Sequence, residues 1–432
     1  MIGRRLWVGL ALGVASLTGT ELGWQRIRLA SNLADARRAA IFADPEAAVT
    51  RISDLRARSP RNAELAYLLA IAHRRQGQTA NARADIKKAA DLGWPLNDLQ
   101  RQHFLIRFQS GQIEDAKAHL LEMLREGCAD DAAVEIYDCM AKGYLADMRL
   151  REAQISVEHW LAWQPKSAQA HLMRAEVANG LNDSHAMIAA YRELLSIDPD
   201  NRQALWRLGF ALLDAHDVRG AKQIFERYLQ LDAEDPMGHL GLAICRRQMG
   251  EIGAAKAGFE KALAGSLPGM RRAAALTELG QIAVSEKSYE QAREYLKEAL
   301  RLLPTSPSAH YALGTLLSKL GETDAASEHV AISRRLEADA ERYEDLFQEV
   351  VRRPDDAGPR CELGEILLKQ GQRKEAFAWL LSALRVDQWN SAAHTALARY
   401  YADAGNDDMA QRHLGWAARD EKSSENVLSS AH

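Results

Sequence analysis

Apolar residues recur along most of the chain with the spacing of amphipathic helices. In the segment ALWRLGFALL, the compact residue Gly209 is followed twelve positions later by Ala221, and then by Phe225 and Tyr228. Two apolar runs of this kind, separated by a short turn, are typical of two antiparallel helices that each bury one face. The pattern therefore predicts helical hairpins, and no segment has the alternation expected of a strand.

The pattern repeats at a nearly constant interval, counted from a compact residue that we call the reference position. The reference positions are Ala36, Ala70, Phe104, Ala141, Ala175, Gly209, Ala243, Gly280, Gly314, Gly364 and Ala398. The intervals between them are 34, 34, 37, 34, 34, 34, 37, 34, 50 and 34 residues. Such a period indicates stacked units that share one continuous core. Phe104 is bulkier than the pattern requires, so we expect its hairpin to be distorted.

Other offsets from the reference position are also kept. Seven residues after it, six units carry a glycine, which supplies the positive φ of a helix C-terminal turn: Gly77, Gly111, Gly250, Gly321, Gly371 and Gly405. Twelve residues after it, alanine allows the two helices to cross closely, with Met187 as the exception: Ala48, Ala82, Ala116, Ala153, Ala221, Ala255, Ala292, Ala326, Ala376 and Ala410. The second helix often stops at a proline: Pro60, Pro165, Pro199 and Pro304.

Together these features resemble the tetratricopeptide repeat family, a 34-residue helix-turn-helix with compact residues at these offsets and a terminal proline. The resemblance covers roughly residues 29 to 418, although Leu, Ala or His stands early in the first helix where the family has Trp. It implies an all-α, right-handed α-solenoid of about ten to eleven hairpins. It also implies an inner surface, lined by the first helix of each unit, that binds extended or helical peptides.

The irregular intervals predict the domain organisation. The two intervals of 37 contain EGCADD and AGSLPGM, which we interpret as three-residue loop extensions. The interval of 50 contains EADAERYEDLFQEVVR, whose helical periodicity predicts an extended or extra helix that stops before Pro354. We therefore expect a main array at 29–336, an extra helix or linker at 337–356, two final units at 357–418 and a disordered, Ser-rich tail at 419–432.

The N-terminal segment 1–28 has the layout of an export signal. Arg4 and Arg5 precede an apolar run from Leu6 to Thr20. As a helix this run reaches about 22 Å, less than the roughly 30 Å of a bilayer core, and no convincing cleavage site follows it. We favour a signal anchor over a cleaved signal peptide, which places the array on the extracytoplasmic, periplasmic side. A first helix buried against the solenoid is the alternative.

Composition narrows the range of partners. The chain has 55 Lys and Arg against 59 Asp and Glu, a net charge of -4, so no global positive field attracts nucleic acid. Its four cysteines, Cys128, Cys139, Cys245 and Cys361, form no metal-binding or disulfide pattern, and we expect reduced packing residues. A bridge between Cys128 and Cys139 stays open.

Signatures of catalysis, metals and cofactors are missing from the sequence, which has no HExxH, GxSxG, GxxxxGK[ST] or GxGxxG motif in a suitable context. Four histidines recur four residues before the reference position: His171, His239, His310 and His394. Because they lie in different units, several helix layers apart, they cannot share a metal, and we expect them to pack between helices. The prediction is a protein that is not an enzyme and holds no cofactor.

The resemblance places the inner strip three residues before, one after and four after each reference position. Two adjacent units then present an apolar patch with one cation: Trp206, Phe210, Leu213, Leu240, Ile244 and Arg247. Neighbouring strips are polar, with Glu176 and Asn179 on one side and Thr277 and Gln281 on the other. We expect this patch to be the hot spot for a hydrophobic peptide. The alternative is that the six side chains pack between the two units.

The carboxylate clamp of chaperone-binding family members requires Lys and Asn at defined inner positions. Lys142, Arg74 and Arg399 fall on the strip, but no matching Asn does, so that class of partner is not supported. The leading hypothesis is a membrane-tethered scaffold that recruits other proteins. The alternative is an accessory or regulatory subunit of an envelope enzyme or of a transport or assembly machine.

Overall fold

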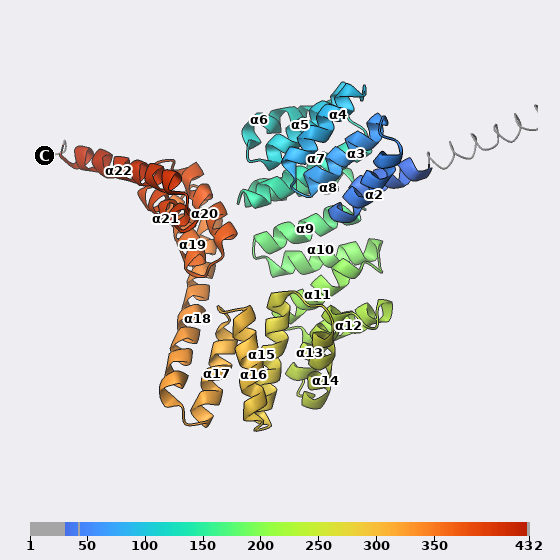
Figure 1. Ribbon diagram of the computed structural model, residues 1–432. Helices are drawn as coiled ribbons and strands as arrows, with labels where there is room; N and C mark the ends of the chain where they lie inside the picture. Colours follow the sequence, from blue (N-terminus) through green and yellow to red (C-terminus); the bar gives the residue numbers. More distant parts are fainter. Residues whose placement is uncertain (1–30, 42–43, 430–432) are drawn as a thin grey trace, which may run out of the picture. The chain divides into compact units, whose positions relative to one another are not determined.

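The computed structural model describes residues 31–41 and 44–429, with side chains up to residue 418. All regular secondary structure in these ranges is helical (Figure 1), which confirms the predicted all-α fold. The chain divides into two compact units, residues 1–143 and residues 144–432. We call them unit 1 and unit 2 and describe each by itself.

In unit 1, a helix at 31–41 precedes the labelled helices. These are α2 (Pro45–Arg58), α3 (Ala63–Arg75), α4 (Thr79–Asp91), α5 (Leu96–Gln109), α6 (Ile113–Glu126) and α7 (Asp130–Ala146), whose last turn enters unit 2.

Unit 2 continues with the second helix of the same hairpin, followed by seven further helix pairs. Its helices are α8 (Leu150–Trp163), α9 (Ala168–Gly180), α10 (Ser184–Ile197), α11 (Arg202–Asp214), α12 (Val218–Leu231), α13 (Pro236–Gln248), α14 (Ile252–Ala264), α15 (Gly269–Ser285), α16 (Tyr289–Leu302), α17 (Pro307–Lys319), α18 (Thr323–Arg352), α19 (Ala357–Lys369), α20 (Arg373–Val386), α21 (Ser391–Asp403) and α22 (Asp407–Ser429).

Local sequence explains where these helices begin and end. Seven of the first helices start after a side chain that accepts a hydrogen bond from the helix's exposed amides: Asn62, Ser167, Asn201, Asp235, Ser306, Asp356 and Asn390. Four of the second helices, α2, α8, α10 and α16, end two residues before the predicted prolines.

The turn inside each hairpin confirms the role expected of the residue at offset seven. The six glycines there have positive φ, between 71° and 85°. Four other hairpins have the same backbone conformation without glycine, at Met148, Asn182, His216 and Lys287, with φ between 53° and 61°. Because a side chain is strained in this region, the four turns carry a local cost that glycine would avoid.

The compact positions lie where the helices of a hairpin cross. The ten alanines at offset twelve are buried, none more than 6% exposed. A Cβ atom on Gly209 would stand 2.6 Å from Phe225, and one on Gly280 would stand 2.6 Å from Leu296. The residue sixteen positions after the reference therefore occupies the space that glycine leaves free, which closes the hairpin. Phe104, the bulky exception, stacks on His119 at 4.1 Å, and α5 and α6 pack less closely than α3 and α4.

The intervals of 37 residues do not lengthen loops, so that prediction was wrong. Both α7 and α15 contain 17 residues, whereas most other first helices contain 13. The added residues extend the first helix by about one turn at its N-terminus, and neither added turn contains a proline that would prevent this.

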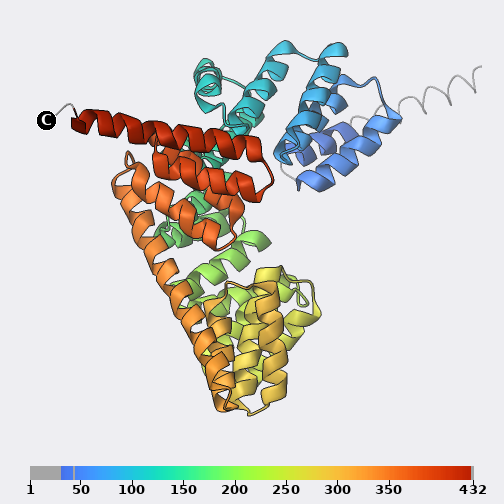
Figure 2. The same cartoon turned by 60° about the vertical axis from the view of Figure 1, so that its left-hand side comes forward.

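The interval of 50 residues corresponds to α18, one continuous helix of 30 residues that runs from the main array to α19 (Figures 1 and 2). It ends at Arg352, before Pro354, as expected. The helix α22 continues to Ser429 through the segment that the sequence analysis assigned to a disordered tail. Neither proline nor glycine follows Gly415, so nothing in the sequence terminates the helix earlier.

The expected N-terminal anchor at 1–28 lies outside the described residues. Among the described helices, none combines the length and the apolar character that crossing a bilayer would need.

Candidate interaction face

The first helices of the hairpins form the inner side of each curved unit. Neighbouring first helices approach each other directly, as in α3–α5, α11–α13, α15–α17 and α19–α21, whereas successive second helices do not do so to the same extent. An array whose first helices are closer together than its second helices curves toward the first helices. In unit 2 the concave face is therefore lined by α9, α11, α13, α15 and α17.

The structure divides the six predicted contact residues into two groups. Phe210, Leu213 and Leu240 are buried in the largest hydrophobic cluster, at 6%, 7% and 0% exposure. For these three residues, the alternative interpretation agrees with the structure: their side chains pack between adjacent repeats. Trp206, Ile244 and Arg247 are half-buried, so part of each side chain remains at the surface. The patch that a partner can reach is accordingly smaller than predicted.

A row of aromatic rings connects this surface to the core. Trp206 meets Phe210 edge to face at 6.2 Å, and Phe210 meets Phe225 edge to face at 5.1 Å. Phe225 reaches this place because Gly209 and Gly241 both leave room for its ring, and a Cβ atom on Gly241 would stand only 2.2 Å away. The row gives Trp206 a rigid base.

Arg271 completes the patch and was missed by the sequence analysis. It lies in the additional turn of α15, and its guanidinium carbon stands 3.9 Å from the centre of the Phe210 ring. Among the described residues, Arg271 makes no hydrogen bond and no ion pair within 4.0 Å. Burial lowers the pKa of Arg271, and the nearby carboxylate of Asp214 only partly offsets this effect. The 37-residue interval was the signal that could have indicated this residue.

Arg247, on α13, is held loosely. Its Nε lies 3.4 Å from Oε2 of Glu278, and its Nη2 donates a long hydrogen bond of 3.4 Å to Gln281. Burial raises the pKa of Glu278, although Arg247 acts in the opposite direction. Two arginines with weak or no partners thus lie on this face, Arg271 over the ring of Phe210 and Arg247 one turn after Ile244 on α13, and both can form stronger hydrogen bonds with an added carboxylate.

Unit 1 has a different inner side. Arg74 Nη2 stands 2.5 Å from Glu135 Oε1, and Gln102 Nε2 donates to both Glu135 oxygens at 2.9 and 2.8 Å. Arg101 Nη2 donates to the hydroxyl of Tyr67 at 2.6 Å. Burial would lower the pKa of Arg74, but the nearby acidic groups, with Glu135 first among them, more than offset this effect, and the pKa is raised. We call these five residues the polar network; it joins α3, α5 and α7.

The residues considered for a carboxylate clamp are engaged elsewhere. Lys142 pairs with Asp138 at 2.8 Å, Arg399 pairs with Glu365 at 2.9 Å, and Arg74 belongs to the polar network. They are therefore not free to form a common cationic pocket.

The four recurring histidines share one interaction. Each Nε2 lies 2.8 to 3.0 Å from the backbone carbonyl six residues earlier, so this nitrogen carries the proton: His171, His239, His310 and His394. Two of them also meet a second histidine, since Nδ1 of His310 and of His394 lie 2.9 Å from Nδ1 of His329 and of His413. Their role is to fasten the loop before the helix. No group of three or more potential metal ligands occurs among the described residues.

The cysteines show no sign of reactivity. All four are free thiols. Burial raises the pKa of Cys139 to about 12, of Cys245 to about 11 and of Cys361 to about 12, so these thiols stay protonated near neutral pH.

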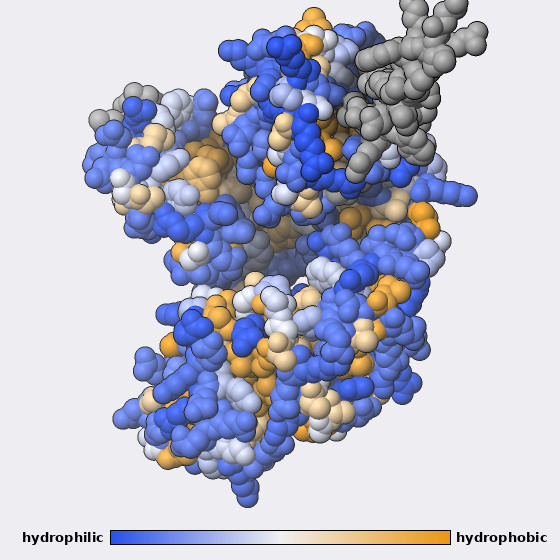
Figure 3. Space-filling view, turned by 45° about the vertical axis from the view of Figure 1, so that its right-hand side comes forward, coloured by the Kyte–Doolittle hydropathy of each residue, from blue (hydrophilic) through white to orange (hydrophobic). Residues whose placement is uncertain are grey.

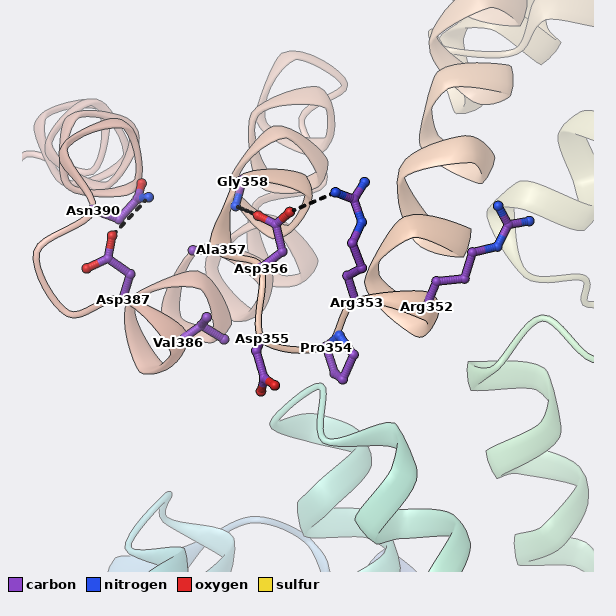
Figure 4. Close-up of a pocket in the computed structure, with 10 residues that line it drawn as sticks. All are labelled: Arg352, Arg353, Pro354, Asp355, Asp356, Ala357, Gly358, Val386, Asp387 and Asn390. Carbon is purple, nitrogen blue, oxygen red and sulfur yellow. Dashed lines mark hydrogen bonds and ion pairs between the residues drawn. The ribbon is translucent and has the colours of Figure 1, made fainter.

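Hollows on the surface offer no better site. A hollow of about 650 Å³ lies at the α18–α19 junction (Figure 4), lined by Arg352, Arg353, Pro354, Asp355, Asp356, Ala357, Gly358, Val386, Asp387 and Asn390. Its polar groups largely serve helix ends: Asp356 accepts from the Gly358 amide at 2.9 Å and faces Arg353 at 3.6 Å. On the face drawn in Figure 3, most of the surface is hydrophilic, and hydrophobic residues gather in several patches within it. The patch around Trp206 is therefore the best candidate.

This architecture, helical hairpins stacked through compact residues with the first helices on the concave side, defines an α-solenoid. Models of the tetratricopeptide repeat match residues 33–96, 168–201, 240–307 and 283–350. The chain belongs to the tetratricopeptide repeat family.

Two curated proteins are similar to parts of the chain. The chain is 29% identical over 266 residues to "Cellulose synthase operon protein C" of Xanthomonas axonopodis pv. citri (strain 306), covering 57% of this chain and 16% of that protein. It is 24% identical over 174 residues to "Protein O-mannosyl-transferase TMTC3" of Homo sapiens, covering 40% of this chain and 19% of that protein. The chain thus spans less than a fifth of either curated relative.

Among solved structures, the chain is similar to PilW, described as a widely conserved type IV pilus biogenesis factor. The identity is 24%, the match covers 46% of this chain and 91% of that chain, and the TM-score is 0.40.

Proposed function

We propose that the protein is an interaction scaffold that recruits partner proteins through the concave face of unit 2. The binding patch comprises Trp206, Ile244, Arg247 and Arg271. It fits a hydrophobic peptide segment flanked by an acidic side chain, because an apolar surface stands directly beside two guanidinium groups.

The observation that supports this most is the state of Arg271. A half-buried guanidinium has lost part of its hydration, and without a hydrogen-bond acceptor it gains little in return. Its stacking on Phe210 holds it in place, and its N–H groups are left for an acceptor from outside. A partner carboxylate would supply that acceptor.

The test compares three single variants of the full-length protein as bait. Trp206→Gln and Arg271→Gln should each lower the affinity for recovered partners by about 2 kcal/mol, roughly thirtyfold, as expected at a hot spot. The control is Leu231→Gln, which changes a similarly apolar side chain, 40% exposed, on the second helix α12. Partner binding that is unaffected by both patch variants, or equally reduced by the control, would contradict the proposal.

We also propose that residues 1–28 tether the array to a membrane, with the array on the extracytoplasmic, periplasmic side. The support is the sequence pattern alone, Arg4 and Arg5 followed by the apolar run from Leu6 to Thr20. Fractionation should recover the intact chain with membranes and a variant lacking residues 1–28 in the soluble fraction. Protease added to intact spheroplasts should degrade the array, and full protection would show the opposite orientation.

The second candidate function is an accessory subunit of an envelope enzyme or assembly machine. It is favoured by the partial matches to proteins whose names refer to cellulose synthase and to O-mannosyl transfer. Purification from solubilised membranes distinguishes the two candidates. A catalytic partner recovered in fixed ratio supports the accessory role, and a variable set of partners supports the scaffold.

A further inference from the structure

The last two hairpins do not simply continue the array. After Leu336, the last buried residue of the main array on α18, residues 337–342 have no buried side chain, and only Asp339 among them is half-buried. Buried residues resume at Leu346. Residues 337–342 are therefore a solvent-exposed stretch of α18, which we call the bare stretch. It connects the main array to the segment 343–418, which we call the end block.

The end block packs against the beginning of unit 2. One hydrophobic cluster contains Leu346, Phe347, Val350, Leu363, Ile366, Leu367, Ala376 and Trp379 from the end block together with Leu150 from α8. Leu145, Met148 and Leu181 are partly buried against the same cluster. We call Leu145, Met148, Leu150 and Leu181 the docking edge. About two hundred residues of sequence separate its buried Leu150 from Phe347, so this contact closes unit 2 on itself.

Polar contacts surround the apolar cluster. Arg385 Nη1, on α20, lies 2.5 Å from Oδ1 of Asp147, and its second amino group donates to the backbone carbonyl of Asp147. Asn182 Nδ2 donates to Glu344 Oε2 at 2.5 Å. Asp147 and Asn182 both lie in the turns at the docking edge. The contact thus has an apolar centre and a charged rim, the usual composition of a protein interface.

The contact is nevertheless small on one side. The docking edge supplies one buried side chain to this cluster, Leu150, whereas the end block supplies eight. A contact of this size, connected through one bare helix, differs from the continuous core that joins the other hairpins.

We propose that the end block is a releasable intramolecular latch. When it is docked, it links α18 to α8 and fixes the curvature of the array between them, including the face that carries Trp206. When it is released, the array is free to flex, and Phe347 and Trp379 lose part of their cover. This inference is independent of the proposed partner binding, since the contact between the docking edge and the end block contains none of the four patch residues.

The test measures the distance across the latch in the full-length protein. Labels are placed at the exposed residues Arg151, on α8, and Lys374, on α20, and the distance distribution is recorded by double electron–electron resonance. The wild type should show one short, narrow distribution. Asp147→Arg and Arg385→Asp should each broaden it and shift it to longer distances, and the double exchange should restore the short distance.

The control is Arg342→Asp. It reverses a charge of the same kind but removes a pair that does not involve the docking edge: Arg342, in the exposed stretch of α18, donates to both oxygens of Glu362 on α19 at 2.8 Å. It should leave the distance unchanged. Single variants that retain the wild-type distance, or a short distance that appears only between differently labelled copies after mixing, would overturn the latch. Far-UV circular dichroism of every variant verifies that the helices are intact.

A second pair of variants separates the latch from general stability. Met148→Gly and Lys287→Gly both relieve a positive φ, of 54° and 60°, but only Met148 contributes a side chain to the cluster at the docking edge. Met148→Gly should therefore increase the population of long distances, and Lys287→Gly should not. An equal response to both substitutions would contradict the proposal.

Discussion

Two arginines at the same place in the repeat have opposite surroundings in the two units. Arg74 and Arg247 both stand four residues after their reference position. Arg74 is 3% exposed and lies 2.5 Å from Glu135, whereas Arg247 is 33% exposed at its side chain and lies 3.4 Å from Glu278. The repeat position thus fixes where a side chain points, but its neighbours decide whether it is used inside the molecule or offered to a partner.

The position two residues before the reference shows the same contrast. In unit 1 it is Gln102, fully buried and bonded to Arg74 and Glu135. In α13 it is Gly241, and the ring of Phe225 fills the space. Unit 1 closes its inner side with hydrogen bonds among its own residues, whereas unit 2 supports an aromatic surface there. This difference is why we place the binding patch in unit 2.

The largest expected effect comes from opening the polar network. Glu135→Leu leaves Arg74 buried without its carboxylate and removes the acceptor of Gln102. Losing one partner of a buried pair costs about 3–5 kcal/mol, so urea denaturation should show unit 1 destabilised by this amount.

Two comparisons check the cause of this effect. The double variant Arg74→Met with Glu135→Leu should be less destabilised than Glu135→Leu alone, because no unpaired charge remains. Glu122→Leu, which removes an exposed pair with Arg125 at 3.4 Å, should cost less than about 1 kcal/mol. If Glu135→Leu cost no more than Glu122→Leu, the network would not stabilise unit 1.

An intermediate effect is expected at Gly241. In Gly241→Ala the new methyl group would meet the Phe225 ring, and such overpacking costs about 1–3 kcal/mol. Gly253→Ala is the matched control, because Gly253 is an exposed helical residue with nothing within 4 Å of its Cβ position. That control should stabilise the helix by roughly 0.5–1 kcal/mol. Thermal unfolding monitored by circular dichroism measures both, and equal stabilisation by both would refute the close fit.

The smallest effect concerns pH and the histidine pair of the last hairpin. Burial, and next the neighbouring His394, lowers the pKa of His413. The unfolded chain therefore takes up a proton near pH 6.5 while the folded one does not, so this contribution to stability is complete above pH 6.5 and is lost as the pH falls. The midpoint temperature of thermal unfolding should decrease when the pH is lowered from about 7.5 to about 5.5. His413→Gln should reduce this dependence and the exposed His185→Gln should not; an unchanged slope in His413→Gln would rule out the pair as its source.

Much of the fold could be predicted from the sequence because each hairpin is defined by local signals. Compact residues at offsets zero and twelve, the turn at offset seven and the terminal prolines are short-range features. The 37-residue intervals led to the wrong prediction of longer loops, because spacing shows how many residues are added but not whether they belong to a loop or a helix. The helix through 419–429 was missed because its Ser-rich composition was weighted more than the absence of a breaker.

The candidate site was harder to predict because the burial of a side chain depends on the neighbouring repeats. The inner-strip rule selected Phe210, Leu213 and Leu240, but adjacent helices cover these side chains. Arg271 stands outside the rule, 61 residues from the Phe210 ring that it covers, and it reaches that ring only through the additional turn of α15. The closing contact of the end block joins distant segments and leaves no periodic trace in the sequence.

The bare stretch of α18 constrains how the length of this chain can vary. Each residue of a helix advances it by about 1.5 Å and turns it by about 100°. One residue inserted or deleted in 337–342 would rotate Leu346 and Phe347 away from Leu150. Even a whole added turn would keep the direction of these side chains but move them about 5.4 Å along the helix axis. Related chains that keep this closure should therefore keep the length of this stretch, so that a solvent-exposed helix constrains the spacing between repeats.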